Sequence, residues 1–283
     1  MSDSSPKTFF ITGISSGFGQ ALASAALAAG HRVVGTARSR EAASAFEALE
    51  PGRAFARQLD VTDHPAVLAV ARDVETTIGP VDVLVNNAGY GHEGVLEESP
   101  LEDMRRQFEV NVFGAVAVIK AFLPFMRGRR RGRILNITSM GGFITMPGIA
   151  YYCGSKFALE GISAALGKEV EGFGVDVTAV APGSFRTDWA GRSMVRTPRS
   201  IVDYDAVFDP VRARRQAVSG RQLGDPAKAA IAMLQIATAA ARPPAHLLLG
   251  SDALGLVRGH LADLQAQLAQ WESLTRSTDA PLA

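Results

Sequence analysis

The sequence predicts a single α/β domain, built on a doubly wound parallel β-sheet with helices on both faces. Short runs of β-branched and apolar residues recur along the chain, and helix-length segments separate most of them. The expected strands cover residues 9–12, 32–36, 81–86, 133–138, 175–180 and 246–250. With 283 residues, of which 47% are hydrophobic, the chain can bury a large core. We expect that core to span about residues 7–250.

Two helix starts are marked by residues that cap helices. Ser99-Pro100-Leu101-Glu102 fits a capping box with proline in the first turn, and Asp225-Pro226 is a shorter version. They predict helices over about residues 100–126 and 226–241. A C-terminal helix is expected over about residues 252–272, where one apolar stripe at helical spacing either covers the domain or meets another subunit. The stripe consists of Leu254, Val257, Leu261, Leu264 and Leu268.

Charge and cysteine content exclude several classes of protein. The formal net charge is +1, and the one basic cluster, five arginines within residues 127–133, is interpreted as a solvated helix end. We therefore expect no nucleic-acid partner. Cys153 is the only cysteine, so no intramolecular disulfide can form, and a reducing, cytoplasmic location is expected. Residues 1–7 lack the pattern of a signal peptide, and no apolar run predicts a membrane span. No metal site is expected.

A glycine-rich turn follows the first strand and leads into a helix over about residues 20–29. The turn reads Thr12-Gly13-Ile14-Ser15-Ser16-Gly17-Phe18-Gly19. Between a strand and a helix, glycines let the backbone approach a pyrophosphate, while the helix N-terminus offers unpaired N–H groups to the anion. A tight turn without a ligand is the alternative. The residues expected to bind the coenzyme here are Gly13, Ser15, Ser16, Gly17, Phe18 and Gly19.

The end of the second strand favours NADP(H) over NAD(H). It reads Val33-Val34-Gly35-Thr36-Ala37-Arg38, without the Asp or Glu that would hold the ribose 2′-hydroxyl of NAD. The guanidinium of Arg38 can bind the 2′-phosphate of NADP through two charge-assisted hydrogen bonds. An ordinary exposed arginine is the alternative interpretation.

Three polar residues predict a catalytic site at one edge of the sheet. Tyr152 and Lys156 are four residues apart at the start of a helix over about residues 151–171, so they share a face. Ser139 lies at the carboxyl end of a strand, the edge where open α/β sheets bind ligands. A tyrosine has an ordinary pKa of about 10, and a neighbouring ammonium stabilises its phenolate. Tyr152 is therefore the expected acid/base, with Lys156 supplying the charge and Ser139 binding the substrate oxygen.

Asn111 lies in the middle of a predicted helix, where asparagine is a weak helix former. It is a candidate to hold a water that relays protons to Lys156. An asparagine satisfied by a local backbone carbonyl is the alternative.

These motifs together resemble the short-chain dehydrogenases/reductases of the single-domain branch, which have a Rossmann-type fold, over about residues 7–250. The family's TGxxxGxG turn matches residues 12–19, with Phe18 where isoleucine or leucine is more usual. Its adenine-contacting acid matches Asp60-Val61, and its NNAG strand end matches Asn86-Asn87-Ala88-Gly89. Pro182-Gly183, followed by Thr187, resembles the segment that orients the nicotinamide. The active-site tetrad matches Asn111, Ser139, Tyr152 and Lys156.

The resemblance implies an NADP(H)-dependent oxidoreductase that interconverts a carbonyl and an alcohol. It also implies that Lys156 binds the nicotinamide ribose, and that the chain forms homo-oligomers, dimers or tetramers, through the helices over about residues 100–126 and 151–171. The further residues implied in coenzyme binding are Arg38, Asp60, Val61, Asn87, Ala88, Gly89, Tyr152, Lys156, Pro182, Gly183 and Thr187.

Two other functions are weighed against this one. A catalytically silent, dinucleotide-binding regulator would be expected to have lost Tyr152, Lys156 or Ser139, and the chain has all three. An extended nucleotide-sugar epimerase would have tighter glycine spacing and a larger C-terminal domain than the residues after Gly183 supply.

Residues 184–224 lack a clear period and are expected to form a substrate lid. Their apolar side chains, with Phe143 and Met146, favour a lipophilic ketone or alcohol as the small-molecule substrate, unless they pack only against the protein. These apolar residues are Trp189, Met194, Val195, Ile201, Tyr204, Val207 and Phe208. The segment's arginines allow an acidic substrate or are merely solvated. They are Arg186, Arg196, Arg199, Arg212, Arg214, Arg215 and Arg221.

Overall fold

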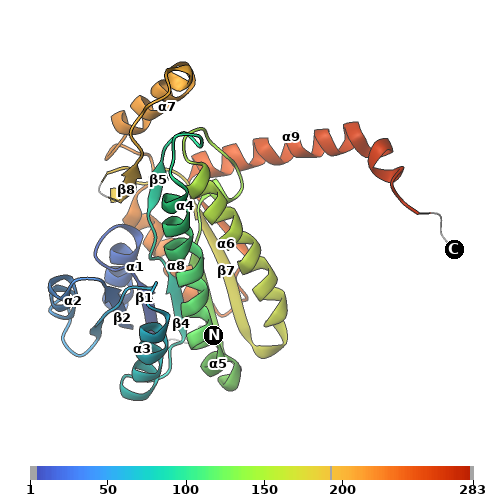
Figure 1. Ribbon diagram of the computed structural model, residues 1–283. Coiled ribbons are helices and arrows are strands. Elements are labelled where there is room, and N and C mark those ends of the chain that lie inside the picture. The colour runs from blue at the N-terminus through green and yellow to red at the C-terminus, as the bar shows by residue number, and fades with distance from the viewer. Residues whose placement is uncertain (1–4, 192, 281–283) are drawn as a thin grey trace.

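A seven-stranded parallel sheet forms the centre of the protein (Figure 1). The computed structural model describes residues 5–191 and 193–280; residues 1–4, part of the region without a signal-peptide pattern, Arg192 of the expected lid and residues 281–283 lie outside the described residues. The strand order is β3-β2-β1-β4-β6-β7-β9, so the predicted doubly wound fold is confirmed. The strands are β1 (Thr8–Thr12), β2 (Arg32–Ala37), β3 (Ala54–Gln58), β4 (Val83–Asn86), β6 (Gly132–Ile137), β7 (Val175–Pro182) and β9 (His246–Leu249).

The strand order reverses at β1, which pairs with β2 on one side and β4 on the other. In open α/β sheets a crevice forms outside the carboxyl ends of the strands at such a point. All of the described neighbours in the sheet are parallel, so their carboxyl ends share one edge. This edge holds the candidate site.

Three strands were not expected from the sequence. The edge strand β3 presents Ala54 and Ala56 to the interior, and alanine is a weak strand former, so the local signal is small. The other two, β5 (Gly91–Glu93) and β8 (Met194–Arg196), pair in parallel as a separate small sheet. Three residues are too few to show a period.

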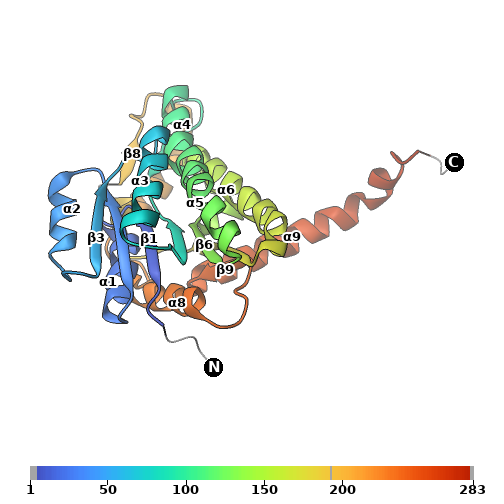
Figure 2. The same cartoon turned by 90° about the horizontal axis from the view of Figure 1, so that it is seen from below.

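Helices cover both faces of the main sheet, as Figure 2 shows. Phe9 packs in a cluster with α1 (Gly17–Ala28), α2 (Arg40–Glu47) and α8 (Pro226–Thr238), whereas Phe10 packs on the other face. The helices on that other face are α3 (His64–Thr77), α5 (Ala115–Arg129) and α6 (Ala150–Glu169). Successive strand residues point to opposite faces, and burying each phenylalanine contributes about 1.5–3 kcal/mol, so one strand stabilises both layers.

One long helix runs over Leu101–Arg129 and contains α4 (Leu101–Phe108), a π-helical turn (Glu109–Gly114) and α5. Among the described residues it is the one helix long and apolar enough to cross a membrane by length and composition, with a mean hydropathy of 1.6. In this fold it packs on the sheet, where Val118 and Phe122 are fully buried.

The two expected helix caps have different outcomes. The capping box at Ser99 is wrong: its hydroxyl donates to the Val95 carbonyl (2.7 Å), and α4 has no side-chain cap. Ser99 is buried against Thr197 of the expected lid, so a tertiary contact takes the hydroxyl that would have capped the helix. The cap at Asp225 is confirmed, since its carboxylate accepts from the backbone N–H of Ala227 (2.9 Å).

The basic cluster lies at a helix end, as expected, but is not simply solvated. Arg129 binds Glu75 (2.6 Å), and Arg131 binds Asp82 (3.0 Å). These pairs tie the end of α5 to α3 and to the residue before β4, while Arg127, Arg130 and Arg131 stay exposed, so the cluster is a solvated helix end that also carries ion pairs.

The C-terminal helix α9 (Ser251–Arg276) projects from the body of the protein (Figures 1 and 2). Only its first turns pack, through Ala253 and Val257 against Met140 and Ile144. The expected apolar stripe therefore does not cover the domain beyond Val257. Its remaining residues are exposed: Leu254, Leu261, Leu264 and Leu268.

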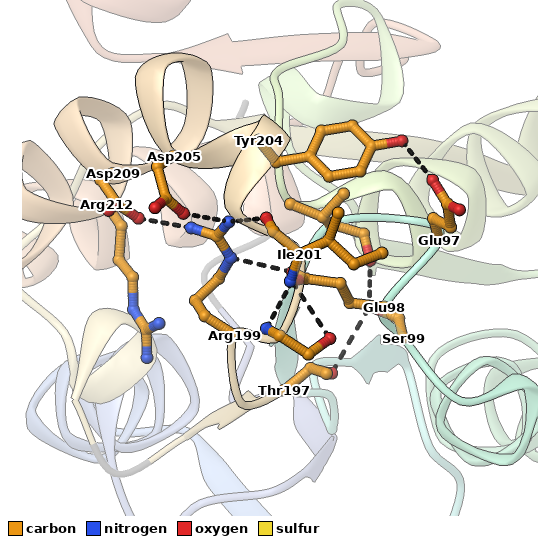
Figure 3. A network of polar contacts seen from close by, with 12 residues as sticks. Glu97, Glu98, Ser99, Thr197, Arg199, Ile201, Tyr204, Asp205, Asp209 and Arg212 are labelled. Atoms are coloured by element: carbon orange, nitrogen blue, oxygen red, sulfur yellow. Dashed lines mark hydrogen bonds and ion pairs between the residues drawn. The ribbon is translucent and has the colours of Figure 1, made fainter.

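The expected lid is structured and attached to the body by charged contacts, drawn in Figure 3. Glu98, whose side chain is 1% exposed, accepts hydrogen bonds from the backbone N–H groups of Ser200 and Ile201, both at 2.6 Å. Arg199 binds Glu98 (2.9 Å) and also Asp205 (2.7 Å) at the start of α7 (Asp205–Ala217). These bonds hold the polypeptide on either side of residue 200 against the segment before α4.

A second buried carboxylate, Glu93, binds three arginines of the lid. Arg196, Arg212 and Arg215 each lie 3.3 Å from its oxygens. With Arg199 bound to Glu98 and Arg186 bound to Asp225 at 3.3 Å, most of the lid arginines have protein carboxylates as partners. These arginines were expected either to be solvated or to bind an acidic substrate. In the structure they bind protein carboxylates and attach the lid instead.

We expect Glu98→Gln to loosen this attachment. Hydrogen bonds from Ser200 and Ile201, together with Arg199, lower the pKa of Glu98 from 4.5 to about 2. The stabilisation by the carboxylate is therefore present above pH 4.5 and is lost as the pH falls towards 2. Calorimetry should find the Tm of the variant a few degrees below that of the wild type at pH 7. Between pH 4.5 and 2, the Tm of the variant should fall less steeply than that of the wild type. The control is Glu102→Gln, which alters an exposed carboxylate that pairs with Arg105 within α4. Equal behaviour of the two variants would contradict the role of Glu98 in attaching the lid.

Candidate active site

A cavity of about 850 Å³ opens at the carboxyl edge of the main sheet. This is within the size range of small-molecule and cofactor sites. The predicted site residues on its wall are Gly13, Ser15, Ser16, Gly17, Phe18, Arg38, Asp60, Val61, Asn87, Ala88, Gly89, Tyr152, Lys156 and Thr187. Those that do not line it are Gly19, Asn111, Ser139, Pro182 and Gly183.

The glycine turn has the backbone shape that the sequence predicts. Gly13 and Gly17 have φ values of 72° and 59°, which side-chain-bearing residues rarely adopt. A Cβ at Gly19 would collide with the Gly13 carbonyl, so Gly19 acts through close packing behind the wall. The turn leads directly into α1, whose first N–H groups have no side-chain cap. This end of the cavity therefore has the shape and the dipole that a pyrophosphate requires.

Asn87 fastens the glycine turn to the neighbouring strand end. Its amide donates to the carbonyls of Thr12 (2.9 Å) and Gly13 (2.8 Å), while the Thr12 hydroxyl accepts from the backbone N–H groups of Asn87 and Ala88, both at 2.9 Å. The side chain of Asn87 is thus committed to the fold. Asn87 therefore serves the site by holding the glycine turn in position.

Arg38 and Asp60 lie at the far end of the cavity, after β2 and β3. The Arg38 side chain is exposed, and its carbonyl accepts from Gln58 (2.9 Å). Asp60 accepts hydrogen bonds from the backbone and hydroxyl of Thr62, at 3.0 and 2.8 Å. These bonds, with the nearby charge of Arg38, lower the pKa of Asp60, so a cation and a carboxylate lie together here.

Tyr152, on α6, is buried beside Ser139, which follows β6. The Ser139 oxygen accepts from the backbone N–H of Gly141 (3.0 Å), which fixes the side chain and leaves its hydroxyl proton available to donate. Burial raises the pKa of Tyr152 to about 12, and the interaction with Ser139 opposes this shift. The phenol is therefore protonated at neutral pH and able to donate.

Lys156 lies one turn after Tyr152 and is also buried. Its ammonium donates to the carbonyl of Ile137 (2.8 Å) and lies 5.7 Å from the Tyr152 ring centroid. Burial lowers the pKa of Lys156 to about 8. The nearby carboxylate of Glu160 partly opposes this shift. Lys156 is consequently charged at neutral pH, where its charge favours the phenolate of Tyr152.

Glu160 was not singled out in the sequence. Its carboxyl is 6% exposed, and it is bonded to Thr138 (2.5 Å) and to His246 (2.8 Å). Burial raises its pKa. The spacing of four residues from Lys156 on one helix is the signal that could have identified it.

Asn111 lies in the π-helical turn and does not bond locally, so the alternative of a local carbonyl is wrong. Its carbonyl oxygen accepts from the backbone N–H of Tyr90 (3.1 Å), and its amide donates to the Tyr90 carbonyl (3.1 Å) and to Ser155 (3.1 Å). A Cβ at Gly89 would lie 3.0 Å from the Asn111 oxygen and 3.8 Å from Lys156 Nζ. Because Gly89 has no side chain, the side chains of Asn111 and Lys156 can both lie close to its backbone.

Gly183 packs against the carboxylate of Asp252 at the start of α9, a position where a Cβ would collide. The next backbone N–H, of Ser184, donates to Asp252 (2.7 Å). Pro182 ends β7. Neither residue forms part of the cavity wall, whereas Thr187, a few residues later, does.

The lid contributes fewer wall residues than expected. Trp189 and Val195 line the cavity, whereas Phe208 is 2% exposed, packs against Gly148 and lies beneath the guanidinium of Arg199. For Phe208, therefore, packing against the protein is the correct interpretation. Wall residues missed in the sequence mostly adjoin predicted ones: Thr36, Ala37, Leu59, Thr62, Tyr90, Arg106, Glu109, Val110, Ile137, Thr138, Asp188 and Ser193. In the described part of the chain, no cluster of three or more His, Cys, Asp or Glu side chains is placed to hold a metal.

Comparison with known proteins identifies the family. A family profile described as short chain dehydrogenase matches residues 7–195. The chain is also 36% identical over 270 residues to the oxidoreductase BOA17 of Botryotinia fuckeliana, an alignment that covers 95% of this chain and 98% of that protein. The chain belongs to the short-chain dehydrogenase family. It is accordingly an oxidoreductase with a fold that binds nicotinamide dinucleotides.

Two further relatives of this short-chain dehydrogenase are named as reductases. A 3-ketodihydrosphingosine reductase of Bacteroides thetaiotaomicron is 41% identical over 182 residues, 64% of this chain and 65% of that protein. An NADPH-dependent 3-dehydrocapnine reductase of Ornithobacterium rhinotracheale is 34% identical over 205 residues, 70% of this chain and 72% of that protein.

Solved structures agree with the family. A short-chain dehydrogenase from Streptomyces avermitilis matches with a TM-score of 0.90 at 42% identity and covers 98% of this chain and 100% of that one. ElxO with NADP bound matches at 0.74 and 25% identity over 89% of this chain and 100% of that one. A Burkholderia phymatum enzyme in complex with NAD matches at 0.79 and 25% identity over the whole of both chains.

Proposed function

We propose that this short-chain dehydrogenase interconverts a carbonyl and an alcohol, prefers NADP(H), and uses Tyr152 as the acid/base. The observation that carries the proposal is the convergence of the buried Tyr152 and Lys156 on one wall of the cavity, with Ser139 beside Tyr152. A silent dinucleotide-binding regulator has no need of a buried ammonium next to a buried phenol. Burying both groups is costly unless they serve a purpose.

The coenzyme would be held along the rest of the cavity. Gly13 and Gly17 give the turn the positive φ values that a close approach of phosphate needs, and α1 supplies the positive end of its dipole. We assign the adenosine end to Asp60 and Arg38, and the extra phosphate of NADP to Arg38. When bound, the coenzyme donates or accepts the hydride. The NADPH-dependent relative and the NADP-bound neighbour support the preference, although a neighbour with NAD is also known.

The side chains would act in sequence during reduction. Tyr152 donates its phenolic proton to the substrate oxygen as negative charge develops there. Lys156 stabilises the resulting phenolate, because an adjacent ammonium favours the charged form. Ser139 donates a hydrogen bond to the same oxygen and holds the substrate in place. Asn111, whose side chain is fixed by Tyr90 and Ser155, would hold a water that relays protons to Lys156.

We propose a lipophilic carbonyl as the substrate. Trp189 and Val195 of the lid and Tyr90 give the cavity wall aromatic and aliphatic surface. The two relatives named above are called a 3-ketodihydrosphingosine reductase and a 3-dehydrocapnine reductase, which places these two compounds among those to be tried.

We further propose that the whole chain is one domain with a cytoplasmic location, and that it forms a homo-oligomer. The location is supported only by the single cysteine. The oligomer is supported by exposed apolar side chains along α9 and by Phe113 and Phe157 on the long helix and α6, which are 52% and 41% exposed.

Tyr152→Phe tests the chemistry. Loss of the phenolic proton should reduce turnover by roughly 10²–10⁴-fold, while the affinity for NADPH stays nearly unchanged. The measurement is NADPH oxidation with aldehydes, steroid-like ketones, short β-keto esters, quinones and 3-ketodihydrosphingosine. Tyr151→Phe is the matched control, because the hydroxyl of Tyr151 donates to Ser99 instead of facing the cavity. If the Tyr152 variant kept more than half of the wild-type activity, Tyr152 would not be the acid.

Coenzyme choice depends on the charge after β2. NADP should raise the Tm of the wild-type protein more than NAD at equal concentration. Replacing Ala37 with Asp and Arg38 with Leu should reverse the order and weaken NADP binding by roughly 1.5–3 kcal/mol. Arg40→Leu, which removes an exposed arginine outside the cavity wall, should change neither response. A wild-type protein that responds equally to both coenzymes would refute the preference, and the oxidoreductase assignment would stand.

A further inference from the structure

Trp189 lies where the lid meets the catalytic residues. It belongs to a short 3₁₀ helix, Asp188–Ala190, whose start is capped by the Thr187 hydroxyl. Its ring centroid lies 5.0 Å from that of Tyr152, with the planes inclined by 56°. The two rings pack in one cluster with Ile149 and Cys153. Trp189 is thus the lid residue in direct contact with the proposed acid.

The polar edge of this indole makes no hydrogen bond of normal geometry within the described residues. Nε1 of Trp189 is buried, and the one protein group it approaches as a donor is the phenol of Tyr152, whose pKa it lowers. Buried indole N–H groups usually find a partner, because leaving a donor unsatisfied is costly. The nitrogen belongs to a residue on the cavity wall. A bound molecule is therefore the natural source of the missing acceptor.

The indole is held firmly in this orientation. A Cβ at Gly91 would lie 2.8 Å from Nε1, so the ring rests directly on the backbone of Gly91. That backbone is fixed in turn, since the N–H of Gly91 donates to the Ser193 carbonyl (3.0 Å) beside the pairing of β5 with β8. Tyr152 closes the opposite side. The donor is therefore positioned before any ligand arrives.

The atoms around the phenol show which ligand atom the N–H faces. Both Ser139 and Trp189 approach Tyr152 closely enough to favour its phenolate. A carbonyl oxygen that accepts the proton of Tyr152 must lie within hydrogen-bonding distance of the phenol. Such an oxygen would lie beside Ser139 and Trp189, the two side chains that interact with the phenol as hydrogen-bonding groups.

We propose that the indole N–H of Trp189 donates a hydrogen bond to the reacting oxygen of the substrate, as a third donor beside Ser139 and Tyr152. This inference rests on the proposed function. The N–H bond stays intact, since the proton that forms the alcohol comes from Tyr152. A donor fixed at the atom where charge develops stabilises the transition state more than the bound carbonyl, so it raises kcat more than it lowers KM.

The test removes the N–H and keeps an aromatic side chain. Trp189→Phe should lower kcat on the order of 10²-fold, with KM and NADPH affinity little changed. A closer isostere is available because the chain has two tryptophans. In a Trp271→Phe background, benzothienylalanine at position 189 puts sulfur in place of the N–H. It should show the same loss of kcat, while the Trp271→Phe background alone, altered on exposed α9, should match the wild type.

The outcomes separate this inference from the proposed function. A wild-type protein that reduces no carbonyl overturns the proposed function and this inference with it. An active wild type, with a Tyr152→Phe variant that is inactive and a benzothienylalanine variant of unchanged kcat, overturns the role of Trp189 alone. A raised KM at unchanged kcat overturns it equally, because it shows an apolar contact only.

Discussion

The junction between Thr12 and Asn87 joins the two halves of the sheet at the point where the strand order reverses. Four hydrogen bonds of 2.8–2.9 Å connect the Thr12-Gly13 corner to Asn87 and Ala88. They use both amide N–H groups of the Asn87 side chain and the Thr12 hydroxyl as a double acceptor, and they bring the glycine turn against the end of β4. The missing side chain of Gly19 makes that approach possible. Without this junction, the phosphate-binding turn and the catalytic edge would not enclose one cavity.

Burial sets the chemistry at the other end of the same cavity. It raises the pKa of Tyr152 to about 12 and lowers that of Lys156 to about 8. At neutral pH the site therefore holds a proton donor beside a fixed positive charge, which suits reduction of a carbonyl. Glu160 opposes the loss of charge on Lys156, and its own carboxyl is held by Thr138 and His246. Oxidation of an alcohol needs the phenolate of Tyr152 as the base, so this direction should be favoured as the pH rises.

Much of the fold and the catalytic set could be predicted because both depend on local pattern. Apolar runs gave the buried strands, and the spacing of Tyr152 and Lys156 gave a shared helix face. What the sequence missed depends on tertiary contacts. Ser99 has the pattern of a cap, but its hydroxyl bonds Val95 within a buried corner. Several arginines of the lid have acids close by in sequence, such as Asp209 before Arg212, but Glu93, the partner of Arg196, Arg212 and Arg215, lies about a hundred residues away. The unpartnered N–H of Trp189 has no sequence signature at all.

The measurement that tests the proposed chemistry most directly is the transfer of deuterium to a carbonyl compound in a single turnover from NADPH that carries deuterium at both C4 positions. Mass spectrometry of the product alcohol should find one deuterium on the former carbonyl carbon for each NADPH consumed. The solvent-derived proton should appear only on oxygen, because it comes from Tyr152. NADPH that binds in the cavity but transfers no deuterium to any carbonyl tried would contradict the enzyme assignment and favour a dinucleotide-binding regulator.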